Sequence, residues 1–143
     1  MTTLYGIPNC DTVKKARAWL AEHCVEHTFH DFKKQGVPEA ALRRWLEVLG
    51  HETVINRKGS TWRGLDERSK AQVVDNTSAH ALAIGNASLI KRPVVEWDHP
   101  ENGLITVGFD TQHWVGMLPS IHTNLPHIGG ANTNALNTDG NTA

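Results

Sequence analysis

A short apolar run, a turn and an amphipathic helix open this chain, and their order constrains the fold most. Residues 2–5 have the composition of a β-strand, and the turn-forming segment Gly-Ile-Pro-Asn follows at residues 6–9. From residue 11 the apolar side chains recur with helical spacing, since Val13, Ala16 and Leu20 share one face. A second strand is predicted at residues 27–32. This order indicates two parallel strands linked by a helix.

Helices and then a pair of strands are predicted in the rest of the chain. Apolar spacing and capping residues predict helices at about 38–50, 66–74 and 78–84, with polar loops at 33–37 and 56–64. Strands at 94–97 and 104–108, joined by a turn at 98–103, form a hairpin. A last short helix contains residues 114–121 and is interrupted by Pro119.

These elements predict an α/β fold, a mixed sheet with a helical insertion at about residues 38–88. The 143 residues suit one domain, which we place at residues 1–118. Residues 119–143 are rich in Asn, Thr and Gly and show no periodicity, so we expect a disordered tail.

Composition and charge narrow the class of protein. The net charge of −1 argues against a nucleic-acid clamp. No apolar run approaches the roughly 20 residues of a membrane span, so no membrane partner is expected. The first residues lack the basic and apolar regions of a signal peptide, and we expect a cytoplasmic protein.

The two cysteines lie at opposite ends of the first predicted helix. At about 1.5 Å per residue, Cys10 and Cys24 would be roughly 20 Å apart. A disulfide requires Cα atoms within about 7 Å. Both are therefore expected to be free thiols in a reducing compartment.

Cys10 is the candidate nucleophile because it immediately precedes a helix. The first-turn amides of Asp11, Thr12 and Val13, the helix dipole and the charge of Lys14 would stabilise a thiolate there. The same groups would bind an oxyanion. The position three residues after Cys10 is Val13, so a resolving thiol must come from another molecule, such as glutathione. The alternative is that Cys10 is only a small buried side chain.

Four segments in the same order carry a resemblance to a known family. They are Tyr-Gly-Ile-Pro-Asn-Cys-Asp-Thr-Val-Lys-Lys-Ala at 5–16, Phe-His-Asp-Phe at 29–32, residues 56–62, and Leu-Ile-Lys-Arg-Pro at 89–93. The chain resembles the arsenate reductase (ArsC/Spx/YffB) family over about residues 3–115, and most of all its YffB-like branch. The resemblance implies a thioredoxin-like (glutaredoxin-like) fold and a single nucleophilic cysteine. It also implies reduction by glutathione and glutaredoxin.

The resemblance also implies which other residues form the site. In this family an Arg-Pro step with a cis proline lies beside the cysteine, which implies that Arg92 and Pro93 flank Cys10. Arg92 would then bind the anion and stabilise the thiolate; the alternative is an exposed surface arginine.

Further basic side chains of the family correspond less directly to this sequence. A mid-chain arginine of the family corresponds to the loop that holds Arg57 and Lys58, unless Asn56 is the matching position. The sequence departs from the family at residues 107–109, which lack an arginine, and at Gly6, near the place of a histidine. These departures leave arsenate as one candidate substrate rather than the established one.

The sequence supports three functional hypotheses. The first is a glutathione-dependent thiol oxidoreductase of arsenate reductase type, which acts as a monomer on a small oxyanion or a disulfide. It would have no bound cofactor, and glutathione would be its co-substrate. The second is an Spx-like regulator that binds RNA polymerase, and the third is a related fold without activity. A metal site is not expected, because His27 and His30 point to opposite faces of a strand.

Overall fold

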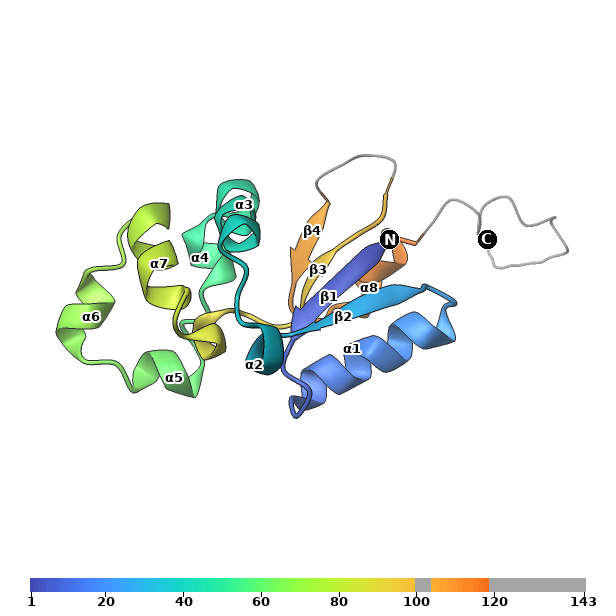
Figure 1. Cartoon of the computed structure of the whole chain (residues 1–143), viewed down its shortest axis with the longest axis horizontal. Helices are drawn as coiled ribbons and strands as arrows, with labels where there is room; N and C mark the ends of the chain where they lie inside the picture. Colours follow the sequence, from blue (N-terminus) through green and yellow to red (C-terminus); the bar gives the residue numbers. More distant parts are fainter. Residues whose placement is uncertain (100–103, 119–143) are drawn as a thin grey trace, which may run out of the picture.

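The computed structural model describes residues 1–99 and 104–118, which form a four-stranded mixed sheet with helices around it (Figure 1). The strands are β1 (Thr2–Gly6), β2 (His27–Asp31), β3 (Val94–Glu96) and β4 (Ile105–Val107). Their order is β2-β1-β3-β4; β1 and β2 are parallel, and β3 is antiparallel to both of its neighbours. The parallel pair and the hairpin confirm the predicted mixed sheet.

One face of the sheet packs against α1 (Asp11–Glu22) and α8 (Thr111–Val115). The apolar face predicted from helical spacing is buried, with Leu20 fully enclosed. Trp114 of α8 meets the edges of two other indole rings, Trp19 at 5.5 Å and Trp97 at 4.9 Å between ring centroids. These apolar contacts pack α1 against the face of the sheet that contains β1.

The other face of the sheet packs against the helical insertion. Its longest helix, α3 (Glu39–Leu49), buries Leu42, Trp45 and Leu46 as the apolar spacing predicts. The other helical elements between β2 and β3 are α2 (Phe32–Gln35), α4 (His51–Val54), α5 (Ser60–Arg63), α6 (Glu67–Ala71), α7 (Asn76–Ala83) and the 3₁₀ turn η1 (Ala87–Leu89).

Two boundaries differ from the prediction because an aspartate side chain caps the start of the helix. Asp31 caps α2, so Phe32 is helical and the expected loop at 33–37 starts as a helix. Asp110 caps α8, which therefore lies at 111–115 rather than at 114–121. The predicted loop at 56–64 contains α5. The predicted tail, Pro119 and most of the 98–103 turn lie outside the described residues.

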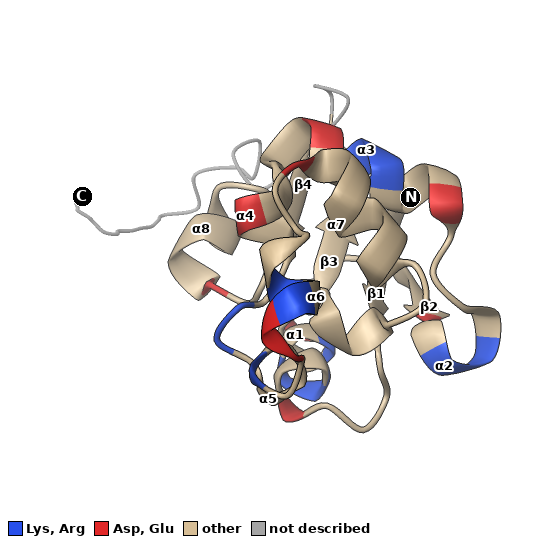
Figure 2. Ribbon diagram, turned by 90° about the vertical axis from the view of Figure 1, so that its left-hand side faces the viewer, with Lys and Arg blue, Asp and Glu red and all other residues tan. Residues whose placement is uncertain are grey.

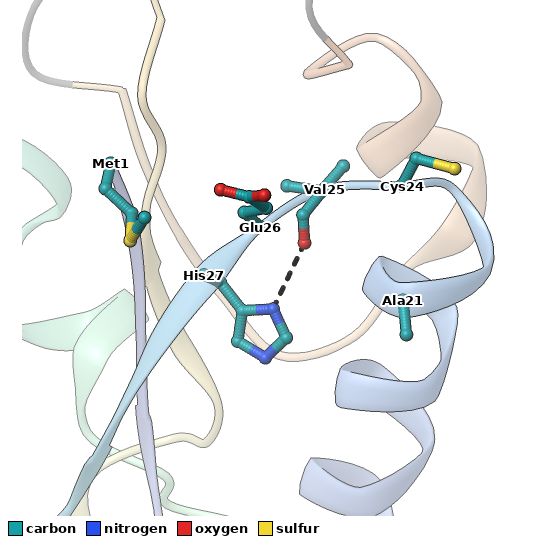
Figure 3. Close-up of a pocket in the computed structure, with 6 residues that line it drawn as sticks. All are labelled: Met1, Ala21, Cys24, Val25, Glu26 and His27. Carbon is teal, nitrogen blue, oxygen red and sulfur yellow. Dashed lines mark hydrogen bonds between the residues drawn. The ribbon is translucent and has the colours of Figure 1, made fainter.

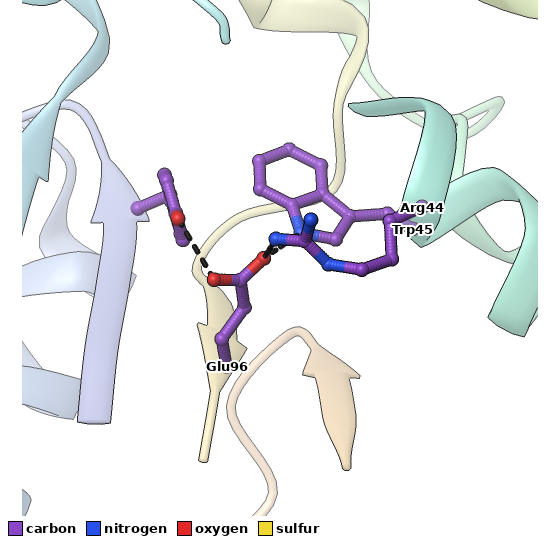
Figure 4. A network of polar contacts seen from close by, with 4 residues as sticks. Arg44, Trp45 and Glu96 are labelled. Atoms are coloured by element: carbon purple, nitrogen blue, oxygen red, sulfur yellow. Dashed lines mark hydrogen bonds and ion pairs between the residues drawn. The ribbon is translucent and has the colours of Figure 1, made fainter. Parts of the chain in front are cut away.

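A polar network joins the insertion to the sheet (Figure 4). The Glu96 carboxylate accepts hydrogen bonds from the Tyr5 hydroxyl at 2.9 Å and the Trp45 Nε1 at 2.8 Å, and it pairs with Arg44. Burial and the Glu96 carboxylate raise the pKa of Tyr5 above its ordinary value, so the hydroxyl stays protonated and donates. Along the described segments, no helix is long and apolar enough to cross a membrane.

Candidate functional site

Cys10 occupies the N-cap position of α1, directly before the first helical residue. Its backbone is extended (φ −100°, ψ 124°), and its carbonyl accepts the first helical hydrogen bond from the Lys14 N–H at 3.0 Å. Its own N–H donates to the Ile7 carbonyl at 3.2 Å, which closes the preceding turn. The thiol is partly buried and makes no capping hydrogen bond. The sulfur is therefore held in place by the backbone while it stays free to react.

The first-turn amides beside Cys10 have no acceptor within the helix. They belong to Asp11, Thr12 and Val13, which precede the first helical bond. Asp11 and Thr12 are exposed, whereas Val13 is buried under β1. A Cβ at Gly6 would lie 2.7 Å from a Val13 methyl carbon, so a glycine is required for this close approach. The predicted anion-binding amides are thus placed next to the thiol.

The end of β1 and the start of β3 meet at this edge of the sheet. Tyr5 pairs with Val94, and extending that antiparallel register by one residue sets Pro93 opposite Gly6. The peptide between Arg92 and Pro93 is cis, as the family resemblance implies, and Pro93 is buried. Pro93 therefore lies beside the turn that leads to Cys10.

The Arg92 side chain is partly buried against the 3₁₀ turn η1. Its Nη1 atom donates to the carbonyls of Ala87 at 3.3 Å and Ile90 at 3.5 Å. Its Nε atom is buried without a hydrogen-bond partner in the part of the chain described. Arg92 is thus neither a fully exposed surface residue nor hydrogen-bonded to Cys10, and its Nε donor is enclosed without a partner.

The mid-chain loop runs alongside the Arg92 segment. The Asn56 N–H donates to the Leu89 carbonyl at 2.8 Å, and Ile55 forms an isolated bridge with Ile90. These contacts bring the basic residues of this loop to the edge that holds Pro93.

Arg57 and Lys58 differ in how they are held. The Arg57 guanidinium lies 4.8 Å from the ring centroid of Trp62 and 3.4 Å from the His51 Nδ1. Lys58 is exposed, and its carbonyl accepts a hydrogen bond from Arg63. Arg57 is therefore oriented by an aromatic ring, while Lys58 offers a solvent-exposed charge.

Basic side chains gather around this edge although the chain has a net charge of −1. In the view of Figure 2, basic loop positions lie beside α5, and the basic positions of α1 lie behind it. Across residues 1–99 and 104–118 the cations in ion pairs are the N-terminus, Arg43, Arg44 and Lys70. Lys14, Arg57 and Lys58 belong to none of these ion pairs, so their charges are available to an anion.

A separate cavity of about 590 Å³ lies at the opposite end of the parallel strands (Figure 3). It is lined by Met1, Ala21, Cys24, Val25, Glu26 and His27. Cys24 is exposed and has a φ of 59°, a left-handed conformation that glycine usually adopts at a helix end. The length of α1, about 18 Å, separates it from Cys10. Nowhere in the described segments do three or more His, Cys, Asp or Glu side chains gather in a way that would hold a metal ion.

Sequence reasoning missed two features of this region. The Glu96 network was hidden because its members are far apart in the chain, although a lone glutamate between Val95 and Trp97 is an unusual residue for a buried strand. The second feature is the position of Lys91, whose backbone N–H donates to the Val54 carbonyl at 2.8 Å. The sequence feature that could have indicated this residue is that Lys91 directly precedes Arg92.

A mixed sheet of this order, with a cysteine at the start of the first helix and a cis-proline segment at the same edge, defines a thioredoxin-like protein. The sequence profile of the ArsC family matches residues 5–117, and the chain belongs to this family.

Related proteins agree with this assignment. A solved structure named YffB is 45% identical, has a TM-score of 0.76, and the match covers 82% of this chain and 99% of that one. An arsenate reductase (ArsC) related protein from Brucella melitensis is 43% identical with a TM-score of 0.63, over 80% of this chain and 92% of that one. A global transcriptional regulator Spx from Streptococcus mutans is 27% identical over 83% of this chain and 84% of its own length.

Proposed function

We propose that this protein is a glutathione-dependent thiol oxidoreductase of the arsenate reductase type, with Cys10 as its nucleophile. The observation that carries the proposal is the placement of Cys10 at the N-terminus of α1, with three first-turn amides that lack helical acceptors. These amides stabilise a thiolate and an anionic substrate in the same place.

In the first step the Cys10 thiolate attacks an electrophile, either arsenic(V) or a disulfide sulfur. With arsenate, a sulfur–arsenic bond forms and an arsenate oxygen leaves as water after protonation. With a disulfide, a new sulfur–sulfur bond forms and the second sulfur leaves as a thiolate. The first-turn amides and the positive charge of the Arg92 guanidinium stabilise the negative charge.

In the second step glutathione supplies the other sulfur. When its thiolate attacks the Cys10 sulfur of the arsenate adduct, a mixed disulfide forms and the sulfur–arsenic bond breaks. The electron pair of that bond reduces arsenic(V) to arsenic(III). Glutaredoxin then removes glutathione from Cys10 and restores the thiol. Cys10 must be reduced for this cycle, which fits a protein in the reducing cytoplasm.

The surrounding cations attract such substrates. Lys14 lies in the first turns of α1, and Arg57 and Lys58 lie on the neighbouring loop. All three are exposed, so they raise the local concentration of anions more than they tighten binding.

The test is arsenate-dependent NADPH oxidation in the presence of glutathione, glutaredoxin and glutathione reductase. We expect turnover that disappears in Cys10→Ser and persists in Cys24→Ser, the matched cysteine control. Turnover that survives in Cys10→Ser would overturn the proposal. If arsenate fails, a small neutral disulfide is the second substrate, in an assay without glutaredoxin and corrected for the rate with glutathione alone.

The Spx relatives favour a second candidate, a regulator that binds RNA polymerase. Val13 occupies the position of the second cysteine in a Cys-x-x-Cys switch, so this chain would bind without that redox control. A pull-down of purified RNA polymerase with the intact protein distinguishes the two candidates. Binding without thiol turnover would support the regulator, and the converse would support the enzyme.

A further inference from the structure

The Lys91 side chain lies over Gly108 at the edge of the sheet that holds Cys10. Gly108 has a φ of +82°, and a Cβ built on it would lie 3.2 Å from the Lys91 Cε and 3.9 Å from its Nζ. An added methyl group would therefore crowd the lysine stem. Because residue 108 has no side chain, the lysine stem can pack directly against its backbone.

Two backbone hydrogen bonds fix this arrangement. The Lys91 N–H donates to the Val54 carbonyl at 2.8 Å, and the Gly108 N–H donates to the Pro93 carbonyl at 2.9 Å. The lysine is thus joined to the helical insertion on one side and to the end of β4 on the other. Its backbone position does not depend on the lysine charge.

The contact between Lys91 and Gly108 lies at the same edge of the sheet as the nucleophile. Since β4 is antiparallel to β3, and β3 is antiparallel to β1, the ends of β1 and β4 point the same way. Gly108 follows β4 as Cys10 follows β1, and Pro93 directly precedes β3, which lies between these two strands. The Lys91 ammonium is exposed and belongs to none of the ion pairs found in the described part of the chain.

We propose that Lys91 is a specificity-determining residue that selects negatively charged thiol and disulfide substrates for Cys10. This inference rests on the proposed function. An exposed cation at the mouth of a site acts mainly on the encounter with a charged substrate. The carboxylates of a glutathione-type substrate supply the complementary charge, and a neutral substrate of the same reactivity gains nothing from it.

The experiment measures the exchange of the Cys10 thiolate with three symmetric disulfides in a Cys24→Ser protein. Glutathione disulfide is anionic, hydroxyethyl disulfide is neutral and cystamine is cationic. In each reaction the Cys10 sulfur forms one sulfur–sulfur bond, the original disulfide bond breaks, and one thiolate leaves, so no other oxidant is required. Rates are followed by intact mass after rapid acid quenching.

Lys91→Met is expected to slow the reaction with glutathione disulfide roughly two- to fivefold, the range of an exposed charge pair. It should leave the neutral rate unchanged and raise the cystamine rate. Lys91→Arg should keep the preference for the anion, and Arg68→Met, which removes an exposed charge on α6 away from this edge (Figure 1), serves as the control.

An anionic-to-neutral rate ratio that falls no further in Lys91→Met than in Arg68→Met would overturn the role of Lys91. If the parent protein does not react with the neutral disulfide, the proposed function itself is wrong. In that case the role of Lys91, which rests on it, is wrong as well.

Discussion

The Tyr5 hydroxyl donates a 2.9 Å hydrogen bond to the Glu96 carboxylate, and these residues are 91 positions apart in the chain. Tyr5 lies on β1 and Glu96 on β3, while Trp45 of α3 donates to the same carboxylate. One acid therefore joins both central strands to the helical insertion. Because β1 leads to Cys10 and β3 follows Pro93, this bond also holds the two halves of the site together.

Replacing Glu96 tests this junction. Glu96→Leu leaves the Tyr5 and Trp45 donors without an acceptor in a partly buried setting, at a cost of about 2–3 kcal/mol in the free energy of unfolding. Glu96→Gln keeps an acceptor oxygen and should cost less than half as much. Urea unfolding measures both, and equal losses in the two variants would contradict the account.

The left-handed backbone at Cys24 predicts a stabilising substitution. A non-glycine residue at φ 59° is strained, so Cys24→Gly should raise the free energy of unfolding by about 0.5–1 kcal/mol. Cys24→Ala removes the thiol and keeps the strain, so it should not stabilise. Thermal unfolding compares them, and a gain in the alanine variant equal to that in the glycine variant would point to the thiol instead.

Asp75 predicts an acid-dependent loss of stability. The Ser78 N–H and hydroxyl donate to its carboxylate and hold its pKa below the ordinary value. Its contribution is therefore complete above the unfolded-state pKa of about 3.9, and it is lost as pH falls through the lower folded value.

Asp75→Asn keeps a capping acceptor without this titration. The difference in urea midpoint between the two proteins should shrink as pH falls below about 4. A difference that stays constant with pH would show that the carboxylate charge does not contribute.

Arg92 predicts a charge-dependent loss of reactivity. Arg92→Gln removes the guanidinium cation, so arsenate turnover should fall by roughly a hundredfold, the lower end of the range for a lost oxyanion donor. Alkylation of Cys10 by neutral iodoacetamide should change far less. A similar loss with both reagents would indicate that Arg92 acts through folding of the η1 segment rather than on the anion.

The sequence predicted the features that depend on local periodicity. The spacing of Val13, Ala16 and Leu20 predicted α1, and the confirmed position of Cys10 at its first turn followed from that helix. The parallel β1–β2 pair and the β3–β4 hairpin were predicted from element order.

The features that depend on tertiary contact were not predictable in this way. Helix α5 has four residues and no apolar period, so its sequence does not distinguish it from a loop. The hydrogen bonds of Arg92 to Ala87 and Ile90 arise from an unpredicted 3₁₀ turn. The position of the Lys91 side chain depends on packing against Gly108, which is distant in sequence and belongs to no recognised motif.

The central claim is that Cys10 is the nucleophile, and the most direct measurement is intact mass and peptide mapping after treatment with glutathione disulfide. We predict one glutathione adduct, located on Cys10, retained in Cys24→Ser and absent in Cys10→Ser. An adduct located on Cys24, or none in the parent protein under conditions where free cysteine reacts, would contradict the account.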